Sequence, residues 1–333
     1  MGCDVVTGGA GFIGSHLVDR ILGMGRDVRV IDNLATGSRR NLAHHEGNPR
    51  LEIIEADLAD RGGIRGLFEG AERVFHLAAL ADIVPSIEDP EAYFRANVEG
   101  TFNAAAEAVR VGAKRFVYAA SSTCYGFPDV FPTPEDSAIR PQYPYALTKN
   151  IGEAIAMHWA QVYKLPALSL RMFNVYGPRA RTSGTYGAVF GVFLAQILAG
   201  EPVTIVGDGT QTRDFTFVSD VVDAFLVAAA TDRVGEIYNV GSGGTYSINR
   251  LVELLAARNK VHIPKRPGEP DCTFADVRKI KRELGWEAKV SFEEGVQAML
   301  DNIEYWRGAP VWTPSKIGEA TKGWFRYLGS ASA

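Results

Sequence analysis

A glycine-rich turn close to the start of the chain constrains the fold more than any other stretch. It spells TGGAGFIG over residues 7–14, after an apolar pair at 5–6 and before a stretch with helical character at 15–22. A strand–turn–helix unit with this glycine spacing is typical of dinucleotide binding, and either Gly8 or Gly9 can serve as its first glycine. Glycine keeps side chains away from the pyrophosphate, and the helix directs its N–H groups toward the phosphates. The contacts predicted from the turn are Gly8, Gly11, Phe12, Ile13 and Gly14.

An acidic residue ends the second predicted strand. Residues 28–31 are predicted to form that strand, and Asp32 follows 18 residues after Gly14. A carboxylate at this position accepts hydrogen bonds from both ribose hydroxyls of NAD and repels the 2′-phosphate of NADP. NAD is therefore the predicted cofactor, and Arg39 and Arg40 close by leave NADP as a less favoured alternative.

Apolar strands alternate with helical stretches through the first half of the chain. Further strands are predicted at 51–54, 73–78, 116–119 and 167–171, and the clearest helices at 91–111 and 143–162. This alternation predicts an α/β fold with a Rossmann-type, doubly wound parallel sheet that helices cover on both faces. Ligands then collect at the carboxyl ends of the strands.

The chain of 333 residues is too long for one typical core, so two domains are expected. Residues 1–172 are predicted to form the NAD-binding domain, and a helix and strand within 216–240 return to it. A smaller mixed α/β substrate domain is expected from 173–215 and 241–307, where glycine and proline become frequent. The tail, 308–333, is predicted to be a docking helix, and a partner-binding helix is the alternative. Its shared face comprises Ile317, Ala320, Trp324 and Leu328.

Composition excludes several classes of function. The net charge is −4 and no basic patch occurs, which argues against a nucleic-acid partner. The longest apolar stretch, 188–199, is too short to span a bilayer, and the start of the chain leaves no room for a signal peptide. Three scattered cysteines indicate reduced thiols, and no cysteines or histidines have metal-ligand spacing. A cytoplasmic protein without a metal is expected.

A reactive pair opens the helix at 143–162. Tyr145 and Lys149 lie four residues apart, so a helix presents them on one face. The ammonium and the positive nicotinamide would lower the pKa of the phenol, which could then accept a hydroxyl proton near neutral pH. Ser121 ends the preceding strand and could hydrogen-bond to the same hydroxyl. These three residues are the predicted catalytic group.

The motifs together resemble the extended short-chain dehydrogenase/reductase family. Within it the chain is similar to the NAD-dependent epimerases and dehydratases, above all the nucleotide-sugar 4-epimerases of the UDP-glucose type. The resemblance runs in order from about residue 5 to about residue 300, and leaves out the tail. Besides the glycine turn and the Tyr145–Lys149 helix, it rests on DNL at 32–34, HLAA at 76–79, SSTCYG at 121–126, RMFNVYGPR at 171–179, RD at 213–214 and RPGE at 266–269.

The resemblance implies roles for further residues at both ends of the site. The implied cofactor contacts are Asp32, Asn33, Leu34, Thr36 and Gly37 at the adenosine ribose, Asp57 and Leu58 at the adenine, Leu77, Ala78, Ala79 and Lys149 along the nicotinamide half, and also Asn97, Tyr145 and Phe173. The implied substrate contacts are Ser121 and Ser122, Asn174 at a phosphate, Arg213 and Arg266 at the diphosphate, Glu269 at the nucleotide ribose, and Thr273. Paired guanidinium groups suit a diphosphate.

The loop after Ser121 separates the reactions that this family catalyses. In the 4,6-dehydratases that the chain resembles, Asp-Glu follows the catalytic Ser or Thr, and decarboxylases keep the Glu. Here Ser122 and Thr123 occupy the two positions, and hydroxyls are poor bases at neutral pH. A 4-epimerase that keeps NAD bound is therefore favoured. The alternatives are a 4-keto sugar reductase, a dehydratase or a decarboxylase, and, outside the enzymes, an NAD-binding regulatory protein.

Two expectations concern assembly and substrate size. The family resemblance implies a homodimer through a four-helix bundle, and the Ala-rich run 104–109 suits close packing of the helices at 91–111 and 143–162. Thr273 lies four residues after Glu269, where relatives with a bulky Tyr accept only small C2 substituents. The small side chain predicts that UDP-N-acetylhexosamines are accepted beside UDP-glucose and UDP-galactose.

Overall fold

The computed structural model describes residues 2–180 and 188–329. A parallel sheet of seven strands forms its base, in the order β11-β6-β5-β4-β1-β2-β3. The strands are β1 (Cys3–Thr7), β2 (Asp27–Asp32), β3 (Leu51–Glu55), β4 (Ala71–His76), β5 (Arg115–Ser121), β6 (Ala167–Met172) and β11 (Glu236–Val240). The Rossmann-type α/β fold is confirmed. The strand order reverses between β1 and β4, which places the ligand crevice at their carboxyl ends.

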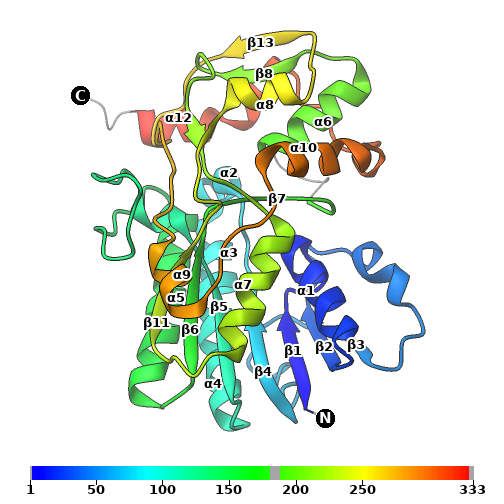
Figure 1. Ribbon diagram of the computed structural model, residues 1–333, viewed down its shortest axis with the longest axis vertical. Helices are drawn as coiled ribbons and strands as arrows, with labels where there is room; N and C mark the ends of the chain where they lie inside the picture. The colour runs from blue at the N-terminus through cyan, green and yellow to red at the C-terminus, as the bar shows by residue number, and fades with distance from the viewer. Residues whose placement is uncertain (1, 181–187, 330–333) are drawn as a thin grey trace.

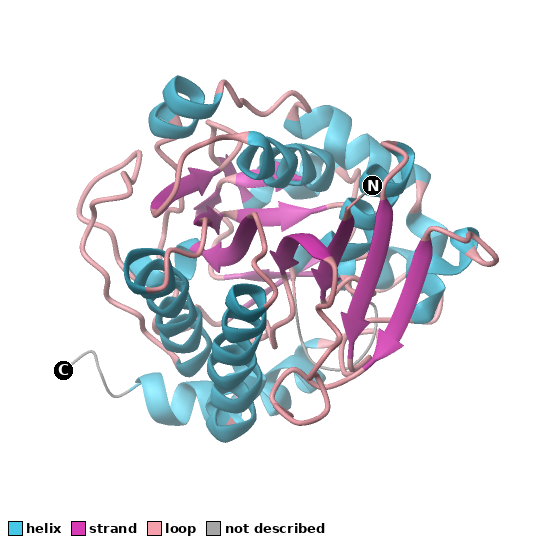
Figure 2. Ribbon diagram, turned by 90° about the horizontal axis from the view of Figure 1, so that it is seen from below, coloured by secondary structure: helices cyan, strands magenta, loops and turns pink. Residues whose placement is uncertain are grey.

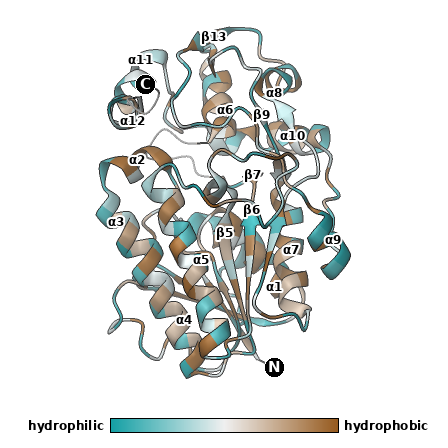
Figure 3. Cartoon of the chain, turned by 90° about the vertical axis from the view of Figure 1, so that its left-hand side faces the viewer, coloured by the Kyte–Doolittle hydropathy of each residue, from teal (hydrophilic) through white to brown (hydrophobic). Residues whose placement is uncertain are grey.

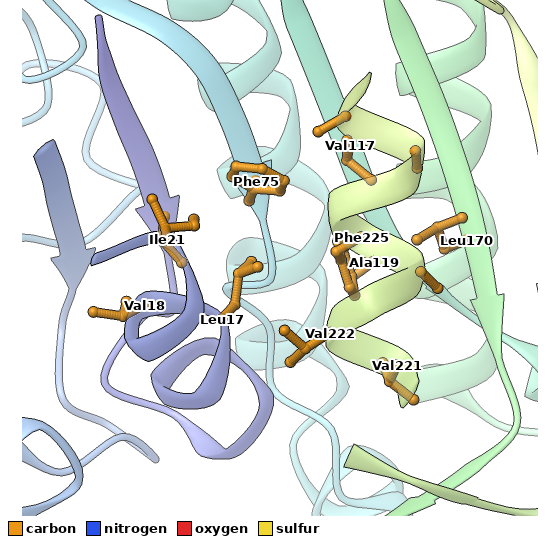
Figure 4. Close-up of a cluster of buried hydrophobic side chains, with 14 of the residues drawn as sticks. Leu17, Val18, Ile21, Phe75, Val117, Ala119, Leu170, Val221, Val222 and Phe225 are labelled. Carbon is orange, nitrogen blue, oxygen red and sulfur yellow. The ribbon is translucent and has the colours of Figure 1, made fainter. Parts of the chain in front are cut away.

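Helices cover both faces of this sheet, as Figure 2 shows from below. On one face lie α1 (Phe12–Gly23) and α7 (Val218–Ala230), and on the other α4 (Gly100–Arg110) and α5 (Pro144–Val162). Successive strand residues point to opposite faces, so Val6 packs toward the first pair of helices and Val5 toward the second. Figure 4 shows Leu17 of α1 and Val222 and Phe225 of α7 beside side chains of the sheet.

The stretch predicted as one helix over 91–111 is divided into three segments. These are α3 (Pro90–Phe94), a π-helical turn (Arg95–Glu99) and α4. Ala104, Ala105 and Ala108 are fully buried against the sheet, so these alanines belong to the core of the chain and are not open to a second subunit. The run 104–109 therefore covers the sheet with one face, and the homodimer stays a prediction.

A second group of elements lies above the carboxyl ends of the strands (Figure 1). It comprises α6 (Val189–Ala199), β8 (Val203–Val206), α8 (Ile248–Leu254), β13 (Lys260–Ile263) and α10 (Phe292–Asp301). Stacked and edge-on aromatic rings fill its core, including Tyr176, Phe190, Phe215 and Phe292. Short strands connect it to the sheet region: β7 (Asn174–Tyr176) with β10 (Phe215–Phe217), and β9 (Thr212–Arg213) with β12 (Tyr246–Ser247).

The remaining elements are short. They are α2 (Ile83–Glu88), α9 (Arg278–Leu284), and 3₁₀ segments at Arg39–His45, Ser122–Tyr125 and Ile303–Trp306. Both α7 and β11 lie on the sheet although they follow the first part of the upper group in sequence. The domain boundaries given above stay a prediction. Among the described residues, no helix is both long enough and apolar enough to cross a membrane.

The C-terminal tail forms two helices where one was predicted. They are α11 (Pro314–Ala320) and α12 (Lys322–Leu328), separated at Thr321. The Thr321 hydroxyl donates a hydrogen bond of 2.7 Å to the carbonyl of Ile317, and such back-bonding bends a helix. Ile317 and Trp324 are nevertheless both buried, so the predicted apolar face does point inward. Figure 3 shows α12 next to α2, against which it packs.

Candidate active site

One large cavity, of about 660 Å³, lies between the sheet and the upper group. Its walls are the glycine turn, the ends of β2, β4 and β5, the first turns of α5, the loop at 266–273 and the C-terminal segment. Of the site residues predicted from sequence, only Leu34, Gly37 and Asn97 do not line it. The fold therefore brings almost all of the predicted residues to one space.

The glycine turn is packed too closely for side chains. Gly8 has φ +70°, and a Cβ there would lie 2.6 Å from the backbone nitrogen of Ala78. A Cβ on Gly14 would overlap the carbonyl oxygen of Gly8. The helix α1 begins directly after Gly11 and has no side-chain cap, so its first N–H groups are not covered by a capping side chain. These are the requirements for a phosphate to approach backbone N–H groups.

The Asp32 carboxylate is fixed at the end of β2 by backbone N–H groups. It accepts hydrogen bonds from Ala10 at 3.0 Å and from Leu34 at 2.8 Å, and only 7% of the residue is exposed. Burial raises its pKa above the ordinary value. A Cβ on Gly37 would lie 2.9 Å from this carboxylate, so the close approach of the two residues leaves no room for a side chain at position 37. The Leu34 side chain packs into the apolar core.

Arg39 and Arg40, which left NADP as the less favoured alternative cofactor, interact with other residues of the chain. Arg39 forms an ion pair with Glu55 at 3.2 Å. The guanidinium of Arg40 lies 4.8 Å from the centre of the Tyr305 ring. Neither side chain lines the cavity. The arrangement around Asp32 therefore suits a ribose with a free 2′-hydroxyl, as in NAD.

Tyr145 and Lys149 line the cavity from the first turns of α5, and Ser121 lines it from the end of β5. A buried ion pair fixes this helix against the sheet: Arg171 of β6 donates to Glu153, one turn after Lys149, at 2.6 Å. The Ser169 hydroxyl also donates to Glu153, at 2.7 Å. Because these interactions with Glu153 are buried, they fix the rotation of α5 about its axis and thereby orient the side chains of Tyr145 and Lys149.

The pKa of Tyr145 is shifted in the opposite direction to the sequence expectation. Burial raises the pKa of Tyr145, and the hydrogen bond with Ser121 opposes the rise. Burial lowers the pKa of Lys149 to about 7, opposed by the charge of Glu153. The expected lowering of the phenol pKa is therefore absent from the protein alone. The positive nicotinamide would add a charge that favours the phenolate.

His76 and Asn97 hold the site together without lining it. The Nδ1 atom of His76 lies 2.7 Å from the Thr7 hydroxyl and its Nε2 lies 2.9 Å from the Thr101 hydroxyl. Burial lowers the pKa of His76 to about 3, so the ring is neutral. The Asn97 side chain bonds to both backbone groups of Leu80 and to the Thr148 hydroxyl. It thereby ties the loop after β4 to α5.

The substrate end of the cavity carries two guanidinium groups and one carboxylate. Arg266 donates to Glu269 at 2.9 Å, and Arg213 lies 4.0 Å from the same carboxylate. Burial lowers the pKa of Arg213. The Thr273 hydroxyl donates to the Asn174 side chain at 2.8 Å and accepts from the Asp214 N–H at 3.1 Å. Loop residues far apart in sequence thus contact one another here.

Several residues of the cavity wall were not identified from the sequence. Asp82 lines the wall, and its charge acts to raise the pKa of Tyr145. Its position four residues after the predicted strand end at Ala78 was the available signal. Tyr143 and Cys272 flank residues that were identified. The tail also lines the cavity, through Ala309, Pro310, Trp312 and Trp324, although sequence reasoning predicted a docking helix there, with a partner-binding helix as the alternative.

Among the described residues, one group has the geometry to hold a metal ion. It comprises Asp19, His44 and His45, outside the cavity wall. Both histidines lie 2.8 Å from one Asp19 oxygen, and Arg179 donates to the other at 2.5 Å. Asp19 is therefore already paired with a guanidinium at this position.

Comparison with known proteins agrees with this geometry. The model of the "NAD dependent epimerase/dehydratase family" matches residues 5–241. A UDP-glucose 4-epimerase of Mycolicibacterium smegmatis is 36% identical over 91% of this chain and 98% of its own length. UDP-glucuronic acid decarboxylase 1 of Arabidopsis thaliana is 35% identical over 90% of this chain and 69% of its own length. A solved UDP-glucose 4-epimerase of Thermotoga maritima, with UDP-glucose, has a TM-score of 0.84 and 35% identity, covering 92% of this chain and 98% of its own.

Proposed function

We propose that this chain, which belongs to the NAD-dependent epimerase/dehydratase family and uses NAD, is a 4-epimerase of a nucleotide-diphosphate sugar. UDP-glucose and UDP-galactose are the proposed substrate pair. The proposal rests mainly on one observation: Ser121, Tyr145 and Lys149 line one cavity, and no carboxylate occupies positions 122 and 123 of its wall. The similarity to UDP-glucose 4-epimerases supports it.

The glycine turn and Asp32 fit the proposed cofactor. Backbone N–H groups at the start of α1 would bind the pyrophosphate, and Asp32 would accept hydrogen bonds from the adenosine ribose. Asn33, Thr36, Asp57 and Leu58 would complete the adenosine end. Leu77, Ala78, Ala79 and Phe173 would lie along the nicotinamide half. Bound NAD supplies an acceptor and later a donor for the hydride at C4 of the sugar.

Tyr145 is the proposed proton acceptor. Its phenolate would take the proton of the 4-hydroxyl while Ser121 donates a hydrogen bond to the same oxygen. Lys149 would stabilise the phenolate by its charge. The 4-keto sugar then turns about its diphosphate link and presents its other face. Tyr145 returns the proton to the new hydroxyl, so the residues end each turnover as they began it.

The substrate end would hold the nucleotide diphosphate. Arg213 and Arg266 would bind the diphosphate, Glu269 the nucleotide ribose and Asn174 a phosphate oxygen. Ser122 and Thr273 would lie near the sugar. In the unliganded protein Arg266 pairs with Glu269, so substrate binding would exchange that carboxylate for phosphate.

Decarboxylation of a UDP-uronic acid is the second candidate, because a decarboxylase matches almost as well as an epimerase. The sequence at the loop argues against it. Thr123 stands where decarboxylases keep Glu, and its hydroxyl donates to Ser121 at 2.9 Å. A hydroxyl cannot act as a base or acid near neutral pH as a carboxyl group does.

Incubation with a panel of nucleotide sugars tests the proposal. UDP-, dTDP-, CDP- and GDP-hexoses and UDP-glucuronic acid are supplied without added cofactor, and products are read by NMR. We expect inversion at C4 of a UDP-hexose, at least about a hundredfold slower with the Tyr145→Phe protein. A 6-deoxy-4-keto product, loss of carbon dioxide from the uronic acid, or a requirement for added NADPH would each assign another reaction.

We also propose a cytoplasmic homodimer. The three cysteines are free thiols, which suits a reducing compartment. Apolar side chains remain exposed along α3, α4 and α5, among them Phe94, Phe102, Leu147 and Val162. A second copy would bury them in a bundle of helices. Light scattering at micromolar concentration should give twice the chain mass, and Phe102→Glu should give the monomer mass. A monomer mass for the parent protein excludes the dimer.

A further inference from the structure

We infer that the C-terminal segment, residues 309–329, forms the outer wall of the substrate end and that its Trp324 is a positioning residue for Arg266. This inference rests on the proposed function, because it assigns Arg266 to the diphosphate of the substrate. It assigns a role to a segment that lies beyond the region matched by the family model.

Trp324 contacts the loop that carries Arg266 and Glu269. Its side chain is buried, with 1% exposed. The indole N–H donates to the carbonyl of Pro267 at 2.5 Å, and the Arg266 guanidinium lies 5.6 Å from the ring. Tyr143, which precedes α5, approaches the same ring at 6.3 Å between centres. The indole therefore lies between the substrate loop and the start of the catalytic helix.

Neighbouring residues of the segment fix the indole. A Cβ on Gly268 would lie 3.3 Å from Leu328, so α12 packs directly on the substrate loop. At the other side α12 packs on α2, which follows the cofactor-side loop. The carbonyl of Trp312 accepts a hydrogen bond from Gln196, which also donates to Thr204 at 3.0 Å. The segment is thus attached to three separate parts of the cavity wall.

An aromatic face suits Arg266 for a physical reason. A guanidinium over an aromatic ring is stabilised there while the N–H groups in its plane can bind an anion. When the diphosphate displaces Glu269, the indole would keep Arg266 in place instead of letting it follow the carboxylate. Removing the ring would then weaken ground-state binding of the nucleotide and leave the chemistry at C4 unchanged.

Substitution of Trp324 tests the inference. Binding of UDP, which needs no turnover, is measured by calorimetry, and kcat and KM are measured with UDP-galactose. We expect Trp324→Leu to raise the Kd of UDP and the KM roughly tenfold, with kcat within about twofold. Trp324→Phe keeps a ring and loses the N–H, so we expect a rise of about threefold. Phe325→Leu, at an adjacent exposed side chain, is the matched control.

The outcomes separate this inference from the proposed function. UDP affinity that is unchanged in Trp324→Leu relative to Phe325→Leu overturns it, as does a fall in kcat with constant KM. If Trp324→Leu does not fold, the UDP affinity, kcat and KM of Trp324→Phe are compared with those of Phe325→Leu in the same way. Weaker UDP binding without epimerase activity in the parent protein supports the role of Trp324 and contradicts the epimerase assignment. A parent protein that binds no UDP contradicts both.

Discussion

At the cofactor end of the cavity, the residues proposed to contact NAD lie at neighbouring strand ends of one sheet. At the substrate end, the residues proposed to contact the substrate lie on loops that form hydrogen bonds and ion pairs with one another. Asp32 is held by backbone N–H groups that the glycine turn and β2 place. Arg266 and Glu269 instead hold each other through a charge pair. One end is fixed by the backbone, and the other by side chains that a ligand can displace.

This difference predicts different sensitivities. At the cofactor end, a substituted side chain is surrounded by backbone that cannot move without disturbing the sheet. At the substrate end, it is surrounded by side chains that can form other hydrogen bonds and ion pairs. We therefore expect changes at the cofactor and catalytic positions to act on all substrates alike, and changes on the substrate loops to discriminate between substrates.

The largest effect is expected at Tyr145, where both ends meet. Tyr145→Phe removes the proton acceptor and keeps the ring that packs against Tyr93. We expect kcat to fall on the order of a hundredfold or more with nearly unchanged UDP binding. Stopped assays of turnover and calorimetry with UDP check this, with the exposed Tyr163→Phe as the control. Near-normal turnover would refute the role of the phenol.

The glycine turn tests how rigid the cofactor end is. Gly8→Ala places a methyl group 2.6 Å from the Ala78 nitrogen at a positive φ. We expect at least about tenfold less NAD in the purified protein, released by denaturation and assayed enzymatically. Gly235→Ala has a similar φ of +74° with open space around it, so it isolates the backbone strain. Equal NAD content in the two variants would show that the glycine turn can rearrange around the added methyl group and still bind NAD.

Lys149 gives a pH-dependent test of burial. Its folded-state pKa of about 7 lies below the ordinary 10.5. Burial of Lys149 therefore lowers the free energy of unfolding by its full amount below pH 7, and this destabilisation disappears as the pH rises toward 10.5. In protein stripped of NAD, Lys149→Met should raise the Tm by about 2–5 °C at pH 6.5. The gain should shrink at pH 9.5. The exposed Lys260→Met is the control, and a gain independent of pH would contradict the assigned cause.

The most selective effect is expected at Thr273, on the substrate loop. Thr273→Tyr enlarges a side chain of the cavity wall and breaks its hydrogen bond to Asn174. We expect kcat/KM for UDP-N-acetylglucosamine to fall about tenfold more than for UDP-glucose. Thr273→Val removes the hydroxyl at constant size and separates the two causes. Equal losses on both sugars, or no activity of the parent on the N-acetylated sugar, would remove Thr273 as the determinant.

Residue patterns by themselves pointed to positions at the cofactor end, whereas those at the substrate end came from the family resemblance, because local patterns encode local structure. The strand ends at Asp32 and Ser121 follow from apolar runs, and a parallel sheet places such ends at one edge. The contact of Trp324 with Pro267 joins segments 57 residues apart, and no local pattern encodes it. The break at Thr321 has a local cause in a side-chain hydrogen bond, yet helical periodicity runs straight across it.

The return of α7 and β11 to the sheet has a consequence for how the chain can be divided. β11 pairs with β6, and Val221, Val222 and Phe225 of α7 are fully buried in the core shared with α1. A fragment that ends at residue 172 would leave β6 as an open edge and expose the face that α7 covers. Such a fragment should aggregate, even though it carries the whole glycine turn and the reactive pair. Residues 1–172 are therefore not separable from the rest of the chain as an independent module.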